Sequence, residues 1–304
     1  MPDPLPVLCL AGPTGAGKTA LALRLAEKLE GEIVNADSRQ VYADFPIITA
    51  QPTESEKRAV PHNLYGFLPL TQRIDAGQWR SLALAECARI AARGRVPLLV
   101  GGTGFYFKSI LTGLADIPPV DKSISAALEL RMAAEGPEPL HAELAAIDPA
   151  YAAKAHPHDR QRIQRALEVW QATGKTFTWW HVHSKSRPLA TGPLLVVAMT
   201  LEELEPRLKH RIGLMLEAGA LEEARRALLS HPHGAHPGWS GIGCAELLRY
   251  LRHEMDMEEC KRLWLANTRA YAKRQLTWFR GEKQAIWIDG ARPDKVLDEL
   301  RKHI

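Results

Sequence analysis

The sequence predicts an α/β fold in which helices flank a parallel β-sheet, with an all-helical insertion in the middle of the chain. Short apolar runs indicate buried strands, and stretches with helical periodicity lie between them; the strands are expected at 7–10, 33–36, 96–100 and 194–199. Strands that alternate with helices form parallel sheets covered on both faces. We therefore expect one central sheet as the framework of the main domain.

The first predicted strand leads into a typical opening unit of such a fold. A glycine-rich turn follows it, and Leu21, Leu25 and Leu29 then recur at a four-residue spacing, which predicts a helix over 19–29. A second helix is expected at 82–92, directly before the third strand. This strand–loop–helix order is the usual start of an α/β sheet.

The middle of the chain has a different character. Residues 117–193 contain no convincing strand, and prolines and a Gly-Pro pair separate their helical stretches. We therefore expect a helical insertion domain at 117–193, set into a core that consists of residues 1–116 and 194–304. The last part of this core, from residue 201 to residue 280, is again mostly helical.

Composition restricts the class of protein. A chain of 304 residues with 46% hydrophobic content can bury a sizeable core. The formal net charge of +4 permits a polyanionic partner without requiring one. The four cysteines form no CxxC pair, and no apolar run approaches the roughly 18–20 residues that span a bilayer. We expect a soluble, cytoplasmic monomer that binds no membrane and no protein partner.

The glycine-rich turn fits the phosphate-binding pattern GxxxxGK[ST]. Glycines let backbone N–H groups surround a phosphate, and the positive end of the next helix points at the anion. This predicts a P-loop NTPase-like core in which Lys18 reaches the terminal phosphate and Thr19 holds Mg²⁺. A nucleoside triphosphate and an organic diphosphate both fit the pattern. The loop consists of Gly12, Pro13, Thr14, Gly15, Ala16, Gly17, Lys18 and Thr19.

Asp37 follows the second predicted strand and has two interpretations. Residues just beyond the carboxyl ends of parallel strands face the ligand crevice, which would place Asp37 near the phosphate loop. Asp is equally a favoured helix N-cap, and the spacing alone does not decide. The neighbouring Arg39 and Gln40 favour a ligand site, because Gln can pair with an adenine edge and Arg can hold a phosphate or stack on a base.

Six motifs in order resemble the tRNA dimethylallyltransferases, or isopentenyl transferases. They are GPTGAGKT at 12–19, DSRQVY at 37–42, LVGGTGFY at 99–106, DRQRIQRALEV at 159–169, RIGLMLEAG at 211–219 and AKRQLTWFR at 272–280. Together they span almost the whole chain, without the C-terminal zinc finger of some eukaryotic members. One departure is Cys244-Ala245, where the family usually has Tyr-Lys; it affects either local packing or a contact to RNA.

The resemblance implies a reaction. A dimethylallyl group would pass from dimethylallyl diphosphate to N6 of the adenosine next to the anticodon on its 3′ side, in tRNAs that read codons starting with U. The phosphate loop would then bind dimethylallyl diphosphate rather than ATP. Lys18, Arg211 and Mg²⁺ on Thr19 would stabilise the leaving diphosphate, and Asp37 would accept the proton of the amine. Contacts to the tRNA anticodon stem-loop are expected from Asp37, Ser38, Arg39, Gln40, Thr103, Gln161, Arg162, Ile163, Gln164 and Arg165.

The basic residues leave alternatives open. Arg162 and Arg165 share a helix face that either grips RNA or is simply solvated. The C-terminal helix carries a basic stripe with the same two interpretations. On nearly the opposite face, Trp264, Tyr271 and Trp278 repeat every seven residues, which favours a core stripe over a base-stacking platform. The histidines between 231 and 236 are expected in a surface loop and not in a metal site.

Three other functions share parts of this sequence pattern. An adenylate isopentenyltransferase would share the phosphate loop and the carboxylate but use a free nucleotide, for which the insertion domain is not needed. A small-molecule kinase would need an adenine site for ATP, which the sequence does not reveal. A binding module with a vestigial phosphate loop would not need the intact Lys18, Thr19, Asp37 and Arg211.

Overall fold

The computed structural model describes residues 3–290 and Val296. The chain divides into two compact units: Met1–Thr112 with Pro188–Ile304 form unit 1, and Gly113–Arg187 form unit 2. The expected insertion at 117–193 covers most of unit 2. Its second boundary falls earlier than expected because β6 (Ala190–Thr191) pairs in parallel with β1 (Leu5–Pro6), which ties the chain to unit 1 before residue 193.

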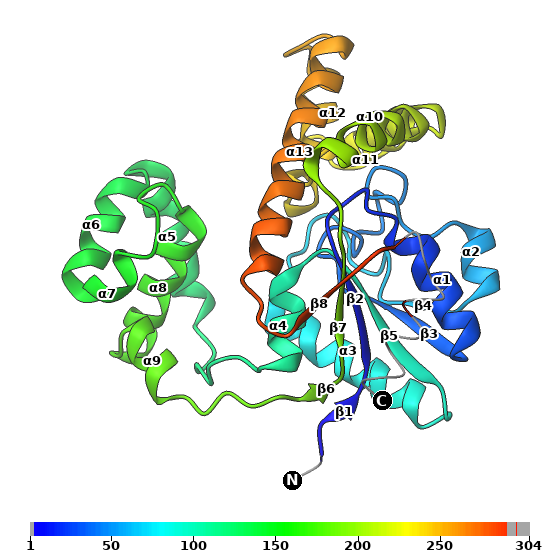
Figure 1. Ribbon diagram of the computed structural model, residues 1–304. Helices are drawn as coiled ribbons and strands as arrows, with labels where there is room; N and C mark the ends of the chain where they lie inside the picture. The colour runs from blue at the N-terminus through cyan, green and yellow to red at the C-terminus, as the bar shows by residue number, and fades with distance from the viewer. Residues whose placement is uncertain (1–2, 291–295, 297–304) are drawn as a thin grey trace. The chain divides into compact units, whose positions relative to one another are not determined.

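Within the described residues, unit 1 contains a six-stranded sheet of order β4-β3-β5-β2-β7-β8 in which every pair is parallel (Figure 1). The predicted fold class and all four predicted strands are confirmed. The edge strands β4 and β8 were not predicted. The strands are β2 (Leu8–Ala11), β3 (Gly31–Asn35), β4 (His62–Asn63), β5 (Val96–Gly101), β7 (Leu194–Val197) and β8 (Ala285–Ile288).

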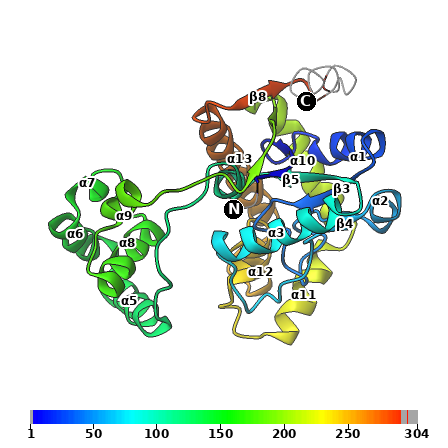
Figure 2. The same cartoon turned by 90° about the horizontal axis from the view of Figure 1, so that it is seen from below.

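Helices cover both faces of this sheet, and Figure 2 shows α1 and α3 on opposite sides of it. Every residue of β2 is buried, because alternate side chains point to two different cores. The helices of unit 1 are α1 (Lys18–Lys28), α2 (Glu54–Ala59), α3 (Ala76–Ala91), α4 (Gly104–Leu111), α10 (Leu201–Glu217), α11 (Ala220–Ser230), α12 (Cys244–Leu251) and α13 (Met257–Arg280), with a 3₁₀-helix, η1, at Pro237–Ser240.

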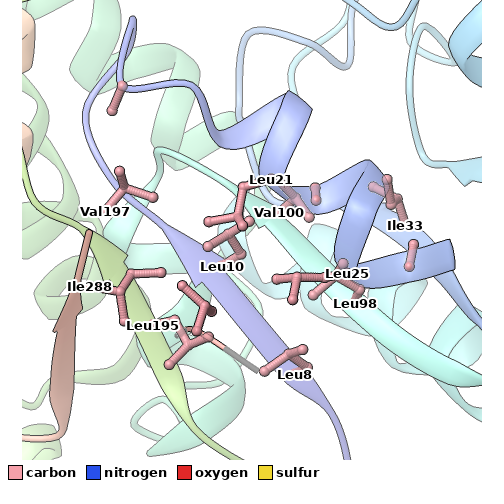
Figure 3. Packing of buried hydrophobic residues seen from close by; sticks show 14 of the residues in the cluster. Leu8, Leu10, Leu21, Leu25, Ile33, Leu98, Val100, Leu195, Val197 and Ile288 are labelled. Carbon is pink, nitrogen blue, oxygen red and sulfur yellow. The ribbon is translucent and has the colours of Figure 1, made fainter. Parts of the chain in front are cut away.

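The first core packs α1 against the sheet. Leu21 and Leu25 of α1 lie over Leu10 and Leu98 of the central strands (Figure 3). Leu25 and Leu10 are both fully buried, and burying a leucine side chain contributes about 1.5–3 kcal/mol. Because α1 begins at Lys18, this packing fixes the phosphate loop relative to the strands.

A third hydrophobic core packs three C-terminal helices against a loop segment. It joins α11, α12 and α13 to the segment 41–48, and Phe45 and Trp239 meet edge to face there with ring centroids 4.8 Å apart. The buried Glu223 carboxylate accepts the backbone N–H groups of Ile47 and Ile48 at 2.8 and 2.9 Å. Burial raises the pKa of Glu223, although these hydrogen bonds oppose the shift.

Unit 2 is helical and has a core of its own. Pro137 and Pro149 stand at the first position of α6 and α7, where proline costs no backbone hydrogen bond, so these prolines mark helix starts. Asp159 caps α8 by accepting the N–H of Arg162 at 3.1 Å. The helices are α5 (Lys122–Ala134), α6 (Pro137–Ile147), α7 (Pro149–Ala152), α8 (Arg160–Thr173) and α9 (Phe177–His183).

The described residues offer neither a membrane span nor a metal-binding cluster. None of the described helices has the length and apolar character that a membrane span requires. Across residues 3–290 and Val296, no group of three His, Cys, Asp or Glu side chains could hold a metal ion.

Candidate active site

The phosphate loop connects β2 to α1, and its backbone depends on glycine. Gly15 and Gly17 adopt φ values of +83° and +86°, a region that favours glycine. The Nζ of Lys18 donates to the carbonyl oxygens of Gly12 and Pro13 at 3.0 and 2.9 Å, so the side chain folds across the loop. Because α1 begins at Lys18, the first N–H groups of the helix lack helical partners and are available to an anion.

The position of Lys18 alters its acidity. The pKa of the Lys18 ammonium is lowered to about 8, chiefly by burial; Asp37 opposes the shift and the nearby Arg211 adds to it. At neutral pH, Lys18 therefore remains mostly protonated. A negatively charged ligand in the loop would favour the protonated form and raise the pKa again.

Asp37 lies in a tight turn directly after β3. Its Oδ1 accepts the backbone N–H of Arg39 at 2.8 Å. The Asn35 side chain braces the same turn by accepting the N–H of Asp37 at 2.8 Å and donating to the Asp37 carbonyl at 3.0 Å. Residues 37–42 form no helix, so Asp37 caps a turn and not a helix. Its side chain lines a cavity, as the ligand-site interpretation requires.

Thr103 lies beside this turn, beyond the end of β5. Its Oγ1 accepts the backbone N–H of Ser38 at 2.9 Å and donates to Ser38 Oγ at 3.3 Å. Burial raises the pKa of Tyr271 although the nearby Arg39 and Thr103 side chains oppose the shift, which keeps the phenol protonated. Close approach requires glycine here, because a Cβ on Gly101 would lie 2.1 Å from the backbone of Ala36.

A cavity of about 250 Å³ lies within unit 1. Its polar lining includes Thr14 of the phosphate loop, residues of the turn after β3, and residues of α10 and α13. Apolar side chains, several of them from the same two helices, complete the lining. The polar lining is formed by Thr14, Asp37, Arg39, Thr49, Arg211, Ser240, Thr268, Tyr271 and Arg274, and the apolar lining by Ile48, Leu208, Ile212, Met215, Ile242 and Trp264.

The charges of this lining favour an anion. Arg39 donates from Nη1 to Ser240 Oγ at 3.0 Å, and the guanidinium of Arg274 lies over the Tyr271 ring, 5.6 Å from its centroid. Burial lowers the pKa of Arg211, and Asp37 opposes that shift. Three arginines thus face a single carboxylate in the lining, and Lys18 adds a fourth cation nearby.

Several expected residues do not line the main cavity, and Gln40 and Thr19 are two of them. Gln40 donates from Nε2 to the carbonyls of Thr49 and Ala50 at 3.1 and 2.6 Å, so its amide N–H₂ group holds a loop and does not face the main cavity. Thr19 is exposed at the start of α1 and does not line the main cavity either. Both residues border a small recess next to His62.

The residues expected at 161–165 belong to α8 in unit 2. Ile163 is fully buried among Leu128, Leu140 and Leu167, so its side chain offers no exposed surface to RNA. The helix explains this burial, because the apolar residues at 163, 166 and 167 form the inward face.

Two neighbours of Ile163 form side-chain contacts within the chain. Gln164 and Arg165 both contact the buried Glu168 carboxylate, at 3.0 and 3.2 Å. Gln161 and Arg162 are exposed, and Arg162 reaches Asp159 at 3.4 Å. Gln161 and Arg162 are therefore the members of this run that are best placed to meet a partner.

A profile of the IPP transferase family matches residues 40–282. The chain belongs to this family. Relatives named tRNA dimethylallyltransferase include one from Desulfovibrio desulfuricans, 57% identical over 97% of this chain and 91% of the relative. Another, from Nitratidesulfovibrio vulgaris strain Miyazaki F, is 54% identical over 96% and 90%. The resemblance drawn from the sequence motifs is thereby confirmed.

Solved structures agree with this membership. The tRNA isopentenylpyrophosphate transferase of Bacillus halodurans superimposes with a TM-score of 0.68 at 31% identity and covers 98% of this chain and 97% of its own. A eukaryotic dimethylallyltransferase acting on tRNA gives a TM-score of 0.79 at 29% identity, over 93% of this chain and 73% of that one.

For this member of the IPP transferase family, α13 contributes more to the site than the sequence indicated. Of its aromatic stripe, Trp264 is 3% exposed and belongs to the core, as expected, but it also borders the cavity. Tyr271 and Arg274 line the cavity and were not predicted as site residues. Arg274 lies in the motif at 272–280 and Tyr271 directly precedes it, so this motif was the sequence signal that could have identified both residues.

The unusual pair Cys244-Ala245 lies at the start of α12. Cys244 is fully buried in the third core, so this half of the departure affects packing. The neighbouring Glu246 accepts the N–H of Gly243 and the side-chain amide of Asn267, each at 2.6 Å. The structure therefore retains a well-anchored helix start at this departure from the family pattern.

Proposed function

We propose that this protein transfers a dimethylallyl group from dimethylallyl diphosphate to N6 of the adenosine 3′-adjacent to the tRNA anticodon, giving N6-isopentenyladenosine. The observation that carries the proposal is that Thr14 of the phosphate loop, Arg211 and Asp37 line the same cavity. A group that binds a diphosphate thereby adjoins a group that can accept a proton. The names of the relatives, and the eukaryotic enzyme that acts on tRNA, support the same reaction.

The donor side would stabilise the leaving group. As the allylic C–O bond breaks, negative charge collects on the diphosphate oxygens. The free N–H groups at the start of α1, the Lys18 ammonium and the Arg211 guanidinium would interact with that charge. Removing one such preorganised group typically costs about 10²–10³ in rate.

The residues at the loop also fit Mg²⁺. The exposed Thr19 hydroxyl has no hydrogen-bond partner among the described residues and is a hard oxygen ligand next to the loop. Mg²⁺ usually takes one or two protein ligands together with phosphate oxygens and waters, so one hydroxyl suffices. When bound, Mg²⁺ supplies positive charge to the diphosphate.

Asp37 would act on the acceptor side. The exocyclic amine of adenine is a weak nucleophile because its lone pair is delocalised into the ring. As the bond from N6 to the allylic carbon forms and the C–O bond breaks, the amine loses a proton to Asp37. A positioned general base of this kind contributes about 10²–10⁴ in rate.

The RNA must present an unstacked base to this cavity. Bases in single-stranded loops can be extruded at low cost, which suits the anticodon loop of a tRNA in the cytoplasm. Arg39, Arg274 and Tyr271 line the cavity and can meet the flipped nucleotide through phosphate contacts or stacking. The insertion domain would contact the stem through Gln161 and Arg162, and a monomer suffices for all these roles.

One assay tests the proposal directly. The purified protein is incubated with Mg²⁺, dimethylallyl diphosphate and an unmodified anticodon stem-loop, and the nucleosides are weighed by mass spectrometry after digestion. A parallel tube contains AMP, and a matched stem-loop carries guanosine at the target position. We expect a dimethylallyl adduct on the adenosine stem-loop alone.

The other outcomes point elsewhere. An adduct on AMP alone would indicate a free-nucleotide acceptor. If folded protein produced no adduct on any acceptor, the proposal would be rejected, and ATP turnover would test the kinase alternative.

A further inference from the structure

The buried amide of Gln275 links two loops of the site. Gln275 lies on α13, is 5% exposed and does not line the cavity. Its Oε1 accepts the backbone N–H of Thr14 in the phosphate loop at 2.9 Å. Its Nε2 donates to the carbonyl oxygen of Gly102 at 2.9 Å, one residue before Thr103. Gln275 thus hydrogen-bonds one loop on the donor side and one on the acceptor side.

The link continues a backbone ladder. The parallel pairing of β2 with β5 ends at Ala11 and Gly101, and the strands continue as the phosphate loop and the 102–104 turn. A side-chain carboxamide offers the same acceptor and donor as a peptide group. The Gln275 amide therefore takes the place of one further peptide link between the two strands, beyond the point where their own backbones pair.

Close packing makes this link tight. A Cβ added to Gly102 would lie 2.1 Å from Gln275 Nε2 and 3.4 Å from Asp37 Oδ2. One helical turn further along α13, the Trp278 ring would be 2.1 Å from a Cβ on Gly104. The turn that carries Thr103 is thus held directly against α13, and it has little room to move relative to the phosphate loop.

We propose that Gln275 is a positioning residue that sets the spacing between the phosphate loop, where the donor diphosphate binds, and the Asp37–Thr103 side, where the acceptor base binds. This inference rests on the proposed function. Gln275 touches neither reactant and acts through Thr14 and Gly102. A misplacement of about 1 Å between reacting groups can cost roughly 10² in rate, so its loss should slow the transfer step and not the binding of either substrate.

Two variants separate positioning from packing. Gln275→Met keeps the length and the volume but removes both hydrogen bonds. Gln275→Glu keeps an acceptor for the Thr14 N–H, but in its ionised form it has no proton for the Gly102 carbonyl. A protonated Glu has one acceptor oxygen and one O–H donor and can restore both bonds. Asn267→Ala is the matched control, since that amide lies on the same helix and bonds Glu246 instead.

The experiment measures single-turnover transfer to the stem-loop at saturating substrates, together with the KM of each substrate. We expect Gln275→Met to lower the transfer rate about 10–100-fold with each KM changed less than about threefold, and Asn267→Ala to behave like the wild type. The rate of Gln275→Glu relative to the wild type should rise between about pH 8 and about pH 5.5, as the carboxyl gains its proton.

The outcomes keep the two proposals apart. A Gln275→Met rate equal to that of the wild type, or a Gln275→Glu ratio that does not change with pH, overturns the positioning role while the proposed function stands. If Gln275→Met does not fold, the pH series of Gln275→Glu decides alone. Wild-type protein that transfers nothing to the stem-loop overturns the proposed function, and the positioning role with it.

Discussion

The backbone N–H of Arg39 donates to Oδ1 of Asp37 at 2.8 Å, so one oxygen of this carboxylate is already held by its own turn. The other oxygen, Oδ2, lies near Gly102 at the 102–104 turn. A general base needs one free oxygen in a fixed orientation. The hydrogen bond to Oδ1 fixes the orientation of the carboxylate and leaves Oδ2 free, which is the arrangement that an acceptor of the adenine proton requires.

Substitution of Asp37 should abolish chemistry without abolishing binding. In Asp37→Asn the amide oxygen can still accept the Arg39 N–H, but the side chain can no longer take a proton. We expect both Asp37→Asn and Asp37→Ala to lose about 10²–10⁴ in single-turnover rate, with the affinity for pyrophosphate largely unchanged. Asp75→Asn is the control, because Asp75 caps α3 and Asn caps equally well. Near-normal turnover in Asp37→Ala would remove Asp37 as the base.

Arg211 should matter more to the transition state than to the bound substrate. Arg211 is half-buried and lines the cavity, where the proposed function would develop charge on the leaving diphosphate. We expect Arg211→Ala to lower the maximal rate by about 10²–10³, and Arg211→Lys to restore part of it. Lys209→Ala, an exposed cation on the same helix, is the control. Equal rates for Arg211→Ala and Lys209→Ala would contradict this role.

Diphosphate binding should depend on pH through Lys18. The pKa of Lys18 is lowered to about 8, below the ordinary lysine value, and the protonated form is the one that binds an anion. Affinity should therefore be constant below about pH 8 and fall above it, by up to about tenfold per pH unit. Calorimetric titration with pyrophosphate across this range measures the effect.

Lys18→Arg is the comparison for this pH series, because arginine stays charged throughout it. The wild type should lose affinity above pH 8 relative to that variant. Parallel curves for the two proteins would show that the ionisation of Lys18 does not control binding.

Much of the framework was accessible from the sequence because its signals are local. The central strands are short runs buried on both faces, and they are apolar enough to be recognised. The edge strand β4 has two residues, His62 and Asn63, which are only half-buried, so no apolar run marks it. The glycine spacing of the phosphate loop is equally local, since the backbone itself requires it.

The contributions of α13 and α8 were harder to predict because they depend on tertiary packing. A seven-residue repeat shows that Trp264 and Tyr271 share a face, but not that this face passes from the core into a cavity. Gln275 has no pattern that reveals its two partners, which are 261 and 173 residues away. For Ile163, motif likeness identified the segment, while helical phase determined which side chains point inward.

Arg162 and Arg165 should differ in their contribution to RNA binding although they lie three residues apart. Arg162 is exposed and its contact to Asp159 is long, at 3.4 Å, whereas Arg165 pairs with the buried Glu168. We expect Arg162→Ala to weaken binding of the stem-loop and to reduce the slope of log K against log salt by about 1. Arg165→Ala should leave the slope nearly unchanged.

Loss of Arg165 should instead lower the free energy of unfolding. Removing this side chain leaves the Glu168 carboxylate without its cation, at a cost of about 1 kcal/mol, since the 43% exposure of the Arg165 side chain screens the pair. Thermal unfolding of the two variants measures this difference. A larger fall in salt slope for Arg165→Ala than for Arg162→Ala would contradict the assignment.

Gly104 and Gly213 form a matched pair that tests how tightly the 102–104 turn packs on α13. A Cβ at Gly104 would lie 2.1 Å from the Trp278 ring, so ring or turn must shift, and we expect Gly104→Ala to lower the free energy of unfolding by about 1–3 kcal/mol. Nothing lies within 4 Å of a Cβ at Gly213, inside α10, where alanine should stabilise by about 0.5–1 kcal/mol. Urea unfolding should therefore give shifts of opposite sign. Because the turn carries Thr103, Gly104→Ala should also slow transfer, and a stable, fully active Gly104→Ala would show that this turn tolerates displacement.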